Sequence, residues 1–463
     1  MTLLGPKIVA ARAVGGLARR AGRGGGTSLP GKVLVSLDRH AIAELAARLP
    51  HGCAVISATN GKTTTAAMTA SVLEGAGSTL VHNRAGANMA GGVASALLES
   101  AHPGGGIGGQ FGLFEVDEFW LERLVHELTP RAILLSNLFR DQLDRYGELE
   151  TIADRWAALA AALPPSTSLV LNADDPLIAD LGRDRDGTPS PRVRYFGVED
   201  PAMAVATMQH AADSKHCRRC GAPYRYEAIY LGHLGRYRCE RCGQERPRPT
   251  VAAHRIALEG TRGARFRLSA PEGSREISLP LPGLYNVYNA LGAAALCLEL
   301  GNNLEAVADG LHSVRAAFGR AESLTVGEVE LSILLMKNPA GANEIMRTVA
   351  LEGSELDLLA VLNDGIADGR DISWIWDADF ELLAGAARLI TCSGTRAAEL
   401  ALRLKYAGVP AERLRVISSL PEALDAALAA AASGRLFALP TYTALLELRE
   451  ELAARGQAQP FWR

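Results

Sequence analysis

The sequence predicts an α/β protein with two doubly wound domains and a small ribbon inserted in the first. Short apolar runs that end in polar residues alternate with helical patterns along most of the chain. A Gly-Lys-Thr turn follows the first of these runs, at residues 61–63. Four cysteines between residues 217 and 242 interrupt the alternation. These three observations define the predicted fold class.

The composition limits the classes of function. Of the 463 residues, 48% are hydrophobic but only 5% aromatic, so Ala, Leu and Val must provide most of the packing. The net charge of −3 gives no reason to expect nucleic acid as a partner. We find no transmembrane segment and no secretory signal, and therefore expect a cytoplasmic protein. Seven cysteines, four of them clustered, fit one metal site better than a disulfide framework.

The first residues are basic and end in a Gly-rich run at 23–26. We predict a basic N-terminal segment and linker over residues 1–45, before a central domain over residues 46–322. A solvated helix followed by a flexible linker is the more common outcome for such a composition. The alternative is contact with anionic lipid or a phosphate through Arg12, Arg19, Arg20 and Arg23.

A phosphate-binding loop is predicted where the strand-like run 53–56 meets the helical pattern 66–74. The backbone N–H groups and the dipole of a helix N-terminus favour an anion there. Lys62 would reach the outer phosphates of a nucleotide, and the Thr63 hydroxyl would bind Mg²⁺. The first glycine of the general G-x-x-x-x-G-K pattern is missing, so a Thr-capped helix is the alternative. The predicted nucleotide-binding residues are Thr59, Asn60, Gly61, Lys62, Thr63 and Thr64.

A second strand-like run, residues 111–115, ends in carboxylates. Because Mg²⁺ prefers oxygen ligands, Glu115 beside the phosphate loop is a candidate magnesium ligand. The alternative is an exposed acidic helix N-terminus, which would also favour Asp117 and Glu118.

Residues 217–242 form a C-x₂-C-x₁₈-C-x₂-C pattern within an insertion at about residues 210–250. The two C-x₂-C pairs supply four thiolates, which suit tetrahedral Zn²⁺. With four cysteines no coordination position remains open for chemistry, so we expect a structural zinc ion. The predicted ligands are Cys217, Cys220, Cys239 and Cys242.

Two further stretches carry candidate site residues. Asn286 and Asn289 share one face of a predicted helix, where they could contact an adenine edge or cap the helix. From residue 323 to 463, strands and helices alternate again, which predicts the second doubly wound domain. The carboxylates of residues 364–377 could be catalytic, although Asp and Gly in a loop are also ordinary turn formers.

Together these motifs resemble the Mur ligase superfamily and, within it, the MurT family. Residues 57–64 look like the family's G-T-N-G-K-T-T loop with Ala58 at the first Gly, and Glu115 stands at its magnesium-binding Glu. The resemblance extends from about residue 27 to the end. It favours MurT because a UDP-binding domain is missing, the four-cysteine ribbon is present, and the segment after Asn363 is similar. Lys337 replaces the His of the His-Asn-Pro motif that other members usually carry.

The resemblance implies a Mur-ligase-type central domain that binds ATP and Mg²⁺, with Arg320 also at the nucleotide. It implies amidation of the D-glutamate α-carboxyl in the lipid II stem peptide, through an acyl phosphate, in peptidoglycan biosynthesis. Lys62 and Mg²⁺ would neutralise the developing charge. Ammonia would come from a GatD-type glutaminase subunit. An aspartate of this chain would complete that subunit's Cys-His pair, in order of preference Asp371, Asp368 and Asp377.

Two alternatives remain from the sequence. One is a single-chain ligase of the Mur or folylpolyglutamate synthase type that uses a free amino acid. The other is a nucleotide-binding regulatory module that has lost catalysis, which Ala58 favours. Contact with the inner face of the membrane would arise only through a lipid-linked substrate or the basic N-terminus.

Overall fold

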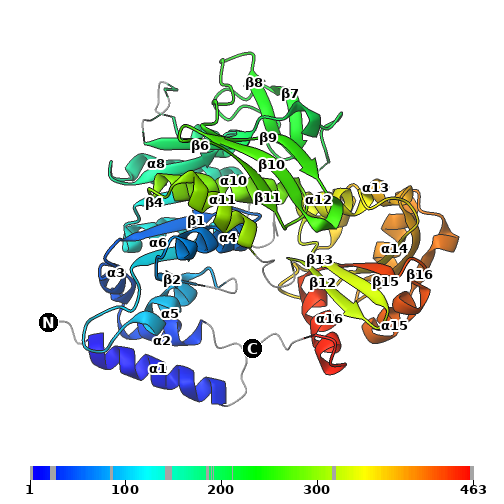
Figure 1. Ribbon diagram of the computed structural model, residues 1–463, viewed down its shortest axis with the longest axis horizontal. Helices are drawn as coiled ribbons and strands as arrows, with labels where there is room; N and C mark the ends of the chain where they lie inside the picture. Colours follow the sequence, from blue (N-terminus) through cyan, green and yellow to red (C-terminus); the bar gives the residue numbers. More distant parts are fainter. Residues whose placement is uncertain are drawn as a thin grey trace.

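The computed structural model describes residues 4–20, 28–83, 87–140, 149–183, 187–188, 190, 192–210, 212–314 and 320–458, without the side chains of residues 18–20 and 320–321. Figure 1 shows a central lobe, coloured blue to green, and a C-terminal lobe, coloured yellow to red. No helix in the described ranges is long and apolar enough to cross a membrane.

The central lobe is built on a nine-stranded sheet in the order β11-β10-β9-β6-β5-β4-β1-β3-β2. From β2 to β9 each strand pairs with its neighbours in parallel, and β9, β10 and β11 form an antiparallel meander. The strands are β1 (Cys53–Ser57), β2 (Leu80–His82), β3 (Phe111–Glu115), β4 (Ala132–Leu135), β5 (Ser168–Asn172), β6 (Val193–Val198), β9 (Val251–Leu258), β10 (Ala264–Ala270) and β11 (Gly273–Leu279).

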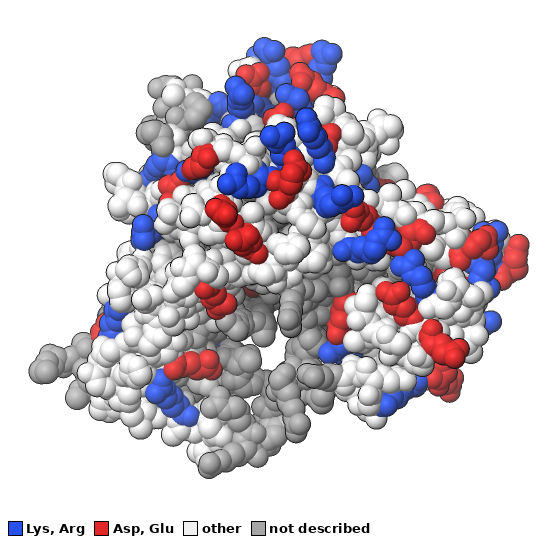
Figure 2. All heavy atoms as spheres, viewed as in Figure 1, with Lys and Arg blue, Asp and Glu red and all other residues white. Residues whose placement is uncertain are grey.

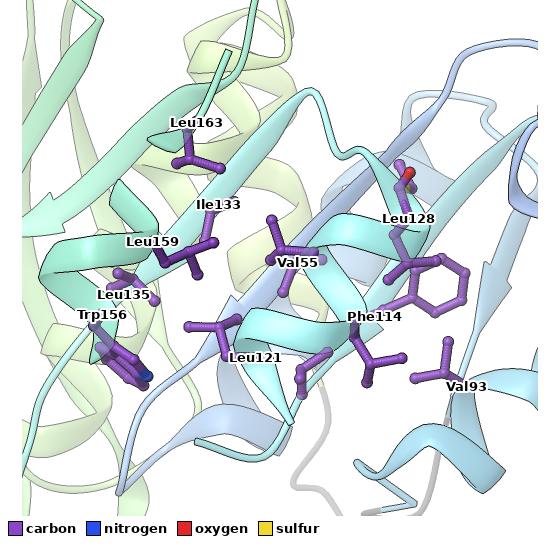
Figure 3. Close-up of a cluster of buried hydrophobic side chains, with 14 of the residues drawn as sticks. Val55, Val93, Phe114, Leu121, Leu128, Ile133, Leu135, Trp156, Leu159 and Leu163 are labelled. Carbon is purple, nitrogen blue, oxygen red and sulfur yellow. The ribbon is translucent and has the colours of Figure 1, made fainter. Parts of the chain in front are cut away.

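Helices cover both faces of this sheet, which is why β1, β3 and β4 are continuous buried runs. In β1, Val55 belongs to one core and Ala54 and Ile56 to the other, as the alternation of a strand requires. Figure 3 shows the Val55 side, where Leu121 and Trp156 pack from neighbouring helices. That side carries α5 (Ala90–Ser100), α6 (Leu121–Leu128), α8 (Leu149–Ala162) and α9 (Pro176–Asp180), and the other carries α4 (Lys62–Gly75), α10 (Leu284–Glu299) and α11 (Leu304–Ser313).

The N-terminal residues differ from the expected solvated helix and linker. They form α1 (Leu4–Arg20), α2 (Leu29–Leu37) and α3 (Ala41–Ala46). Leu4, Ile8 and Ala11 lie one helical turn apart and are buried in the same core as Val55. Close packing of α2 on α5 depends on Gly31, because a Cβ there would lie 2.0 Å from the Gly91 carbonyl oxygen. The described part of residues 1–45 therefore packs as part of the central lobe.

The inserted ribbon is a two-stranded antiparallel hairpin between β6 and β9 in the chain. Its strands are β7 (Tyr224–Leu231) and β8 (Leu234–Cys239). A 3₁₀ turn, η1 (Pro201–Met203), precedes it. Figure 1 shows the hairpin at the top of the molecule, beside β9. Tyr224, Tyr226 and Tyr237 pack against one another edge-on or tilted, with ring centroids 5.1–6.4 Å apart.

The C-terminal lobe has a six-stranded sheet in the order β12-β13-β17-β14-β15-β16. Its strands are parallel except for the β12–β13 hairpin. They are β12 (Arg320–Val326), β13 (Val329–Leu334), β14 (Leu356–Val361), β15 (Ala387–Ser393), β16 (Leu414–Val416) and β17 (Arg435–Pro440). Helices cover both faces: α12 (Pro339–Ala350), α13 (Glu381–Ala384), α14 (Ala397–Tyr406), α15 (Leu420–Ala430) and α16 (Tyr442–Ala454).

Burial of α1 predicts a stability difference between two neighbouring residues. Ile8→Ala should lower the free energy of unfolding by about 2–4 kcal/mol, because it leaves a cavity in the core. Val9→Ala is the matched control, since Val9 is 54% exposed, and should change little. Urea unfolding of both variants measures the difference. Equal stability of the two would mean that α1 does not pack on the central lobe.

Candidate active site

The loop between β1 and α4 is fixed by a left-handed glycine. Gly61 has a φ of +85°, which a residue with a side chain rarely adopts. A Cβ at this position would lie 2.0 Å from Oδ1 of Asn289 on α10. Both backbone strain and close packing therefore require glycine here. The N-terminus of α4 consequently opens directly toward α10.

Asn137, which follows β4, holds the loop in place. Its Oδ1 accepts from the Asn60 N–H at 2.9 Å, and its Nδ2 donates to the Asn60 carbonyl at 3.0 Å. The backbone carbonyl of Asn137 also accepts from the Thr59 N–H at 3.0 Å. We did not predict Asn137 as a site residue. Its position at the end of a buried strand beside the loop was the available signal.

Lys62 is buried beside a carboxylate. Its Nζ lies 3.0 Å from Oε2 of Glu118 and also donates to the Ala58 carbonyl. The Glu118 side chain is 8% exposed and Asp117 is 6% exposed, so the alternative of an exposed acidic helix N-terminus is wrong. Asp117 instead accepts from the Phe119 N–H and shapes the turn after β3. Glu118 was missed as a partner of Lys62 because nothing in the local spacing joins residues 62 and 118.

Two oxygen donors meet next to the loop. The Thr63 hydroxyl donates to Oε1 of Glu115 at 3.0 Å, and Glu115 is 2% exposed. Asn83 fixes the Glu115 backbone with bonds of 2.7 Å to its carbonyl and 2.9 Å from its N–H. Asn88 Nδ2 lies 3.5 Å from the same Oε1. A carboxylate and a hydroxyl at a helix N-terminus fit a hard cation such as Mg²⁺.

Asn286 and Asn289 lie at the site but bond within the protein. Asn286 donates to the Pro282 carbonyl at 2.7 Å, and Asn289 donates to Asn286 Oδ1 at 3.0 Å. Asn289 Oδ1 accepts from the Thr65 hydroxyl at 3.3 Å, which ties α10 to α4. The N-cap residue of α10 is Gly283, without a side-chain cap bond, so the cap alternative does not describe these hydrogen bonds. Both asparagines line the adjoining pocket. The side chain of Arg320 lies outside the described residues.

A pocket of about 360 Å³ opens above the loop and is lined by both lobes. The loop residues Thr59–Thr64 and Glu115 form its floor, and the ribbon contributes Leu231 and Leu234. From the C-terminal lobe come Lys337, Ala340, Gly341, Glu344, Ala367 and Tyr442.

Asn338 joins the two lobes at the pocket. Its Nδ2 donates to Oδ1 of Asn60 at 2.9 Å, while its own Oδ1 caps α12 by accepting from the Gly341 N–H. Burial raises the pKa of Glu344 against the opposing charge of Arg347. Arg347 also donates to the Tyr230 carbonyl of the ribbon at 3.0 Å. These bonds connect the loop, the ribbon and α12 around one cavity.

The four ribbon cysteines converge as the spacing predicted. Their sulfur atoms all lie within 4.8 Å of one another, with Cys217–Cys242 at 3.5 Å and Cys220–Cys239 at 3.4 Å. The backbone N–H of Cys242, with that of Arg241, lowers the pKa of Cys239 to about 6. Four sulfur donors, two from each C-x₂-C pair, fit a tetrahedral metal ion.

The three candidate aspartates that follow β14 lie in different environments. Asp368 is buried, and its two oxygens accept from the N–H and hydroxyl of Thr443 and from the Gly365 N–H. Asp371 is exposed and accepts one backbone bond, from Ser373 at 2.8 Å, which lowers its pKa. Asp377 is half exposed, 4.0 Å from Arg140 of the central lobe. Asp371 and Asp377 thus both reach solvent, whereas Asp368 is buried, and of the two that reach solvent Asp377 alone faces Arg140.

Two family models match the chain. Residues 56–240 match the Mur ligase middle domain, and residues 335–445 match the MurT ligase C-terminal domain. A solved structure of a pseudomurein peptide ligase type C from Methanothermus fervidus has the same fold, with a TM-score of 0.68 at 24% identity over 89% of this chain and 80% of that one.

Curated relatives span nearly the whole chain. The lipid II isoglutaminyl synthase (glutamine-hydrolyzing) subunit MurT of Streptococcus pneumoniae is 33% identical over 433 residues, 93% of each chain. The Staphylococcus aureus protein of the same name is 33% identical over 446 residues, 94% of this chain and 95% of its own. On this similarity, and on the two domain matches, the chain belongs to the MurT family of Mur ligases.

Proposed function

We propose that this chain is the ATP-using subunit of a lipid II isoglutaminyl synthase. It would convert the α-carboxyl of D-glutamate in the stem peptide to the amide of D-isoglutamine, in peptidoglycan synthesis. The names of its relatives support the acceptor and the reaction. One structural observation carries the proposal. The loop after β14 lines the phosphate pocket at Ala367 and reaches the protein surface at Asp371, four residues later.

The nucleotide would bind at the N-terminus of α4. Backbone N–H groups of residues 61–64 and the Lys62 ammonium would face its phosphates. Thr63 and Glu115 would hold Mg²⁺, because their oxygens already meet at 3.0 Å. ATP and Mg²⁺ supply the activation of the carboxylate as an acyl phosphate. The protein's part is to position the reacting groups and to neutralise the developing charge.

The acceptor carboxylate would enter from the side of the C-terminal lobe. Lys337 lines the pocket there and brings a second cation to face an anionic acceptor. On the same wall the buried Glu344 is paired with Arg347 at 2.8 Å, which balances its negative charge.

A glutaminase subunit of the GatD type would supply ammonia at the surface that carries Asp371. An aspartate with a free oxygen can accept a bond from a partner's histidine and stabilise its imidazolium form. Beside this loop, Trp376 is 49% exposed and Tyr406 is 73% exposed, with ring centroids 5.7 Å apart. Exposed aromatic pairs of this kind are common anchors of protein interfaces. Asp371 lies four residues from Ala367, at most about 14 Å along an extended chain, so ammonia formed at this surface would be released near the pocket.

Zinc would hold the ribbon in shape. The ribbon contributes Leu231 and Leu234 to the pocket, and Arg347 bonds to its backbone. A zinc ion held by four thiolates would therefore support the pocket wall without taking part in the chemistry. We place the enzyme in the cytoplasm, where lipid II would present its peptide at the inner face of the membrane.

The proposed function is tested by amidation of lipid II, followed by mass spectrometry. The chain with ATP should amidate lipid II when ammonium is given, but with glutamine only when the glutaminase subunit is added. Lys62→Ala should lower both rates at least about a hundredfold, because the developing phosphate charge loses its cation. Lys32→Ala, at an exposed lysine of α2, is the control. Ligation of a free amino acid without a partner would contradict the proposal.

Substitution of Asp371 should affect the glutamine-driven and ammonium-driven reactions differently. Asp371→Asn should spare the ammonium-driven reaction and reduce the glutamine-driven reaction by about a hundredfold or more, because the partner's histidine loses its orienting carboxylate. Asp377→Asn should leave both rates near wild type, since Asp377 faces Arg140. Selective loss of the glutamine reaction in Asp368→Asn or Asp377→Asn instead would show that the wrong aspartate was chosen.

Removal of a cysteine tests the zinc ribbon. Wild-type protein should contain about one zinc ion per chain by atomic absorption, and Cys239→Ser should lose it and melt at a lower temperature. Cys392→Ala is the control, because Cys392 is buried away from the cluster and should leave the zinc content unchanged. Metal-free wild-type protein with disulfides between the four cysteines would contradict the zinc assignment.

A further inference from the structure

Glu118 is a buried carboxylate of the pocket that phosphate binding alone does not explain. Figure 2 shows acidic and basic side chains spread over the visible surface of both lobes. The Glu118 side chain is only 8% exposed and lines the pocket instead. Its Oε2 lies 3.0 Å from Nζ of Lys62, the cation that would face the phosphates. A carboxylate at this position repels a polyanionic nucleotide, so its presence favours a role in a later step of the reaction.

The other carboxylates that line the pocket are engaged within the protein. Glu115 accepts from a hydroxyl of the phosphate-binding loop at 3.0 Å, and Asp117 accepts from a backbone N–H at 3.1 Å. Glu344 accepts from an arginine of its own helix at 2.8 Å. Among the residues that the structure describes, Lys62 alone bonds to the Glu118 side chain, and it bonds to Oε2. Within that part of the chain, Oε1 is therefore open to a hydrogen-bond donor that enters the pocket.

The turn after β3 keeps Glu118 in this position. The Glu118 backbone carbonyl accepts from Nε1 of Trp156 on α8 at 3.2 Å, and Trp156 is itself buried in the core shown in Figure 3. The preceding residue, Asp117, donates its N–H to the Asn88 carbonyl at 2.9 Å. Because the backbone is held at both points, Glu118 moves mainly about its own side-chain bonds and stays close to Nζ of Lys62.

Lys62 places Glu118 next to the reacting atoms. Nζ also donates to the carbonyls of Ala58 and Thr59, so its three N–H groups are all used. Since those two acceptors are backbone atoms, the bond that a phosphate oxygen can replace is the one to Glu118. That oxygen would lie about 2.8 Å from Nζ and hence at most about 6 Å from Oε2 of Glu118. The carbon of an acyl phosphate is joined to the same phosphate group, so ammonia that attacks the carbon arrives close to a carboxylate released from Lys62.

We propose that Glu118 accepts the proton that ammonia loses when it forms the amide. This role rests on the proposed function. The nitrogen lone pair bonds to the acyl carbon, and the nitrogen becomes positively charged. One N–H proton then passes to a carboxylate oxygen of Glu118. The bond between the acyl carbon and the phosphate oxygen breaks with its electron pair on the phosphate. The products are the amide and inorganic phosphate, which takes the proton from Glu118 and restores the carboxylate.

Hydroxylamine separates this role from one limited to orienting Lys62. It is a stronger nucleophile than ammonia toward an acyl phosphate, and its adduct loses a proton to water more readily. Its reaction therefore depends much less on a base in the pocket, but it needs the same acyl phosphate. A residue that only orients Lys62 would affect the formation of that acyl phosphate, and so both nucleophiles equally.

The test uses the complete complex with its glutaminase subunit, given ATP, lipid II and either ammonium or hydroxylamine. Glu118→Gln should lower amide formation from ammonium about a hundredfold, but hydroxamate formation from hydroxylamine less than about threefold. Glu118→Asp keeps a carboxylate and should give an intermediate loss of amide formation. Glu122→Gln, at an exposed glutamate of α6, is the matched control and should react like the wild type. By calorimetry, Glu118→Gln should bind ATP at least as tightly as the wild type, because a negative charge beside the phosphates is removed.

Two results would overturn the role of Glu118 while leaving the proposed function intact. One is amide formation by Glu118→Gln at the wild-type rate. The other is an equal loss of amide and hydroxamate together with weaker ATP binding, which would mean that Glu118 only orients Lys62. A wild-type complex that forms neither amide nor hydroxamate from lipid II would contradict the proposed function itself, and the role of Glu118 with it.

Discussion

The close approach of α10 to Gly61 is the constraint on which the site depends. Because a Cβ at position 61 would meet Asn289 at 2.0 Å, the loop, α4 and α10 can pack only with glycine at the turn. That packing sets the direction of the α4 N-terminus and so the place where phosphates can bind. Asn137 and Asn338 then hold Asn60 from two further elements. The loop is thus shaped before any ligand arrives, and the C-terminal lobe is tied directly to it.

The sequence predicted those parts whose chemistry is local. Lys62 and Thr63 belong to a short motif that directly follows a buried strand. The spacing of the four cysteines alone predicts the ribbon. The two α/β lobes follow from repeated strands with polar ends. The partners that the sequence could not predict are distant in the chain. Glu118 meets Lys62 across two strands, and Asn338 meets Asn60 across the two lobes, so only tertiary packing brings these pairs together.

For the N-terminal helices the sequence prediction was wrong. Basic charge and a Gly-rich run suggested a solvated segment, but Ile8 and its neighbours at one-turn spacing form a core-facing stripe. Lys7 pairs with Asp38, and Arg12 donates to the carbonyls of Leu98 and Ala101, so these two charges do not prevent packing. Asn286 and Asn289 could be placed on one helical face from the sequence, but their hydrogen bonds to Pro282 and to α4 required the structure.

The most direct measurement of the central claim follows oxygen from the acceptor to phosphate. Lipid II labelled with ¹⁸O in the D-glutamate α-carboxyl would be amidated with ammonium and ATP, and the released phosphate analysed by mass spectrometry. Activation of that carboxyl at the Lys62 loop predicts one labelled oxygen in the phosphate for each amide formed. Amide formation with unlabelled phosphate would contradict the account, because the carboxyl would not have been activated by phosphoryl transfer.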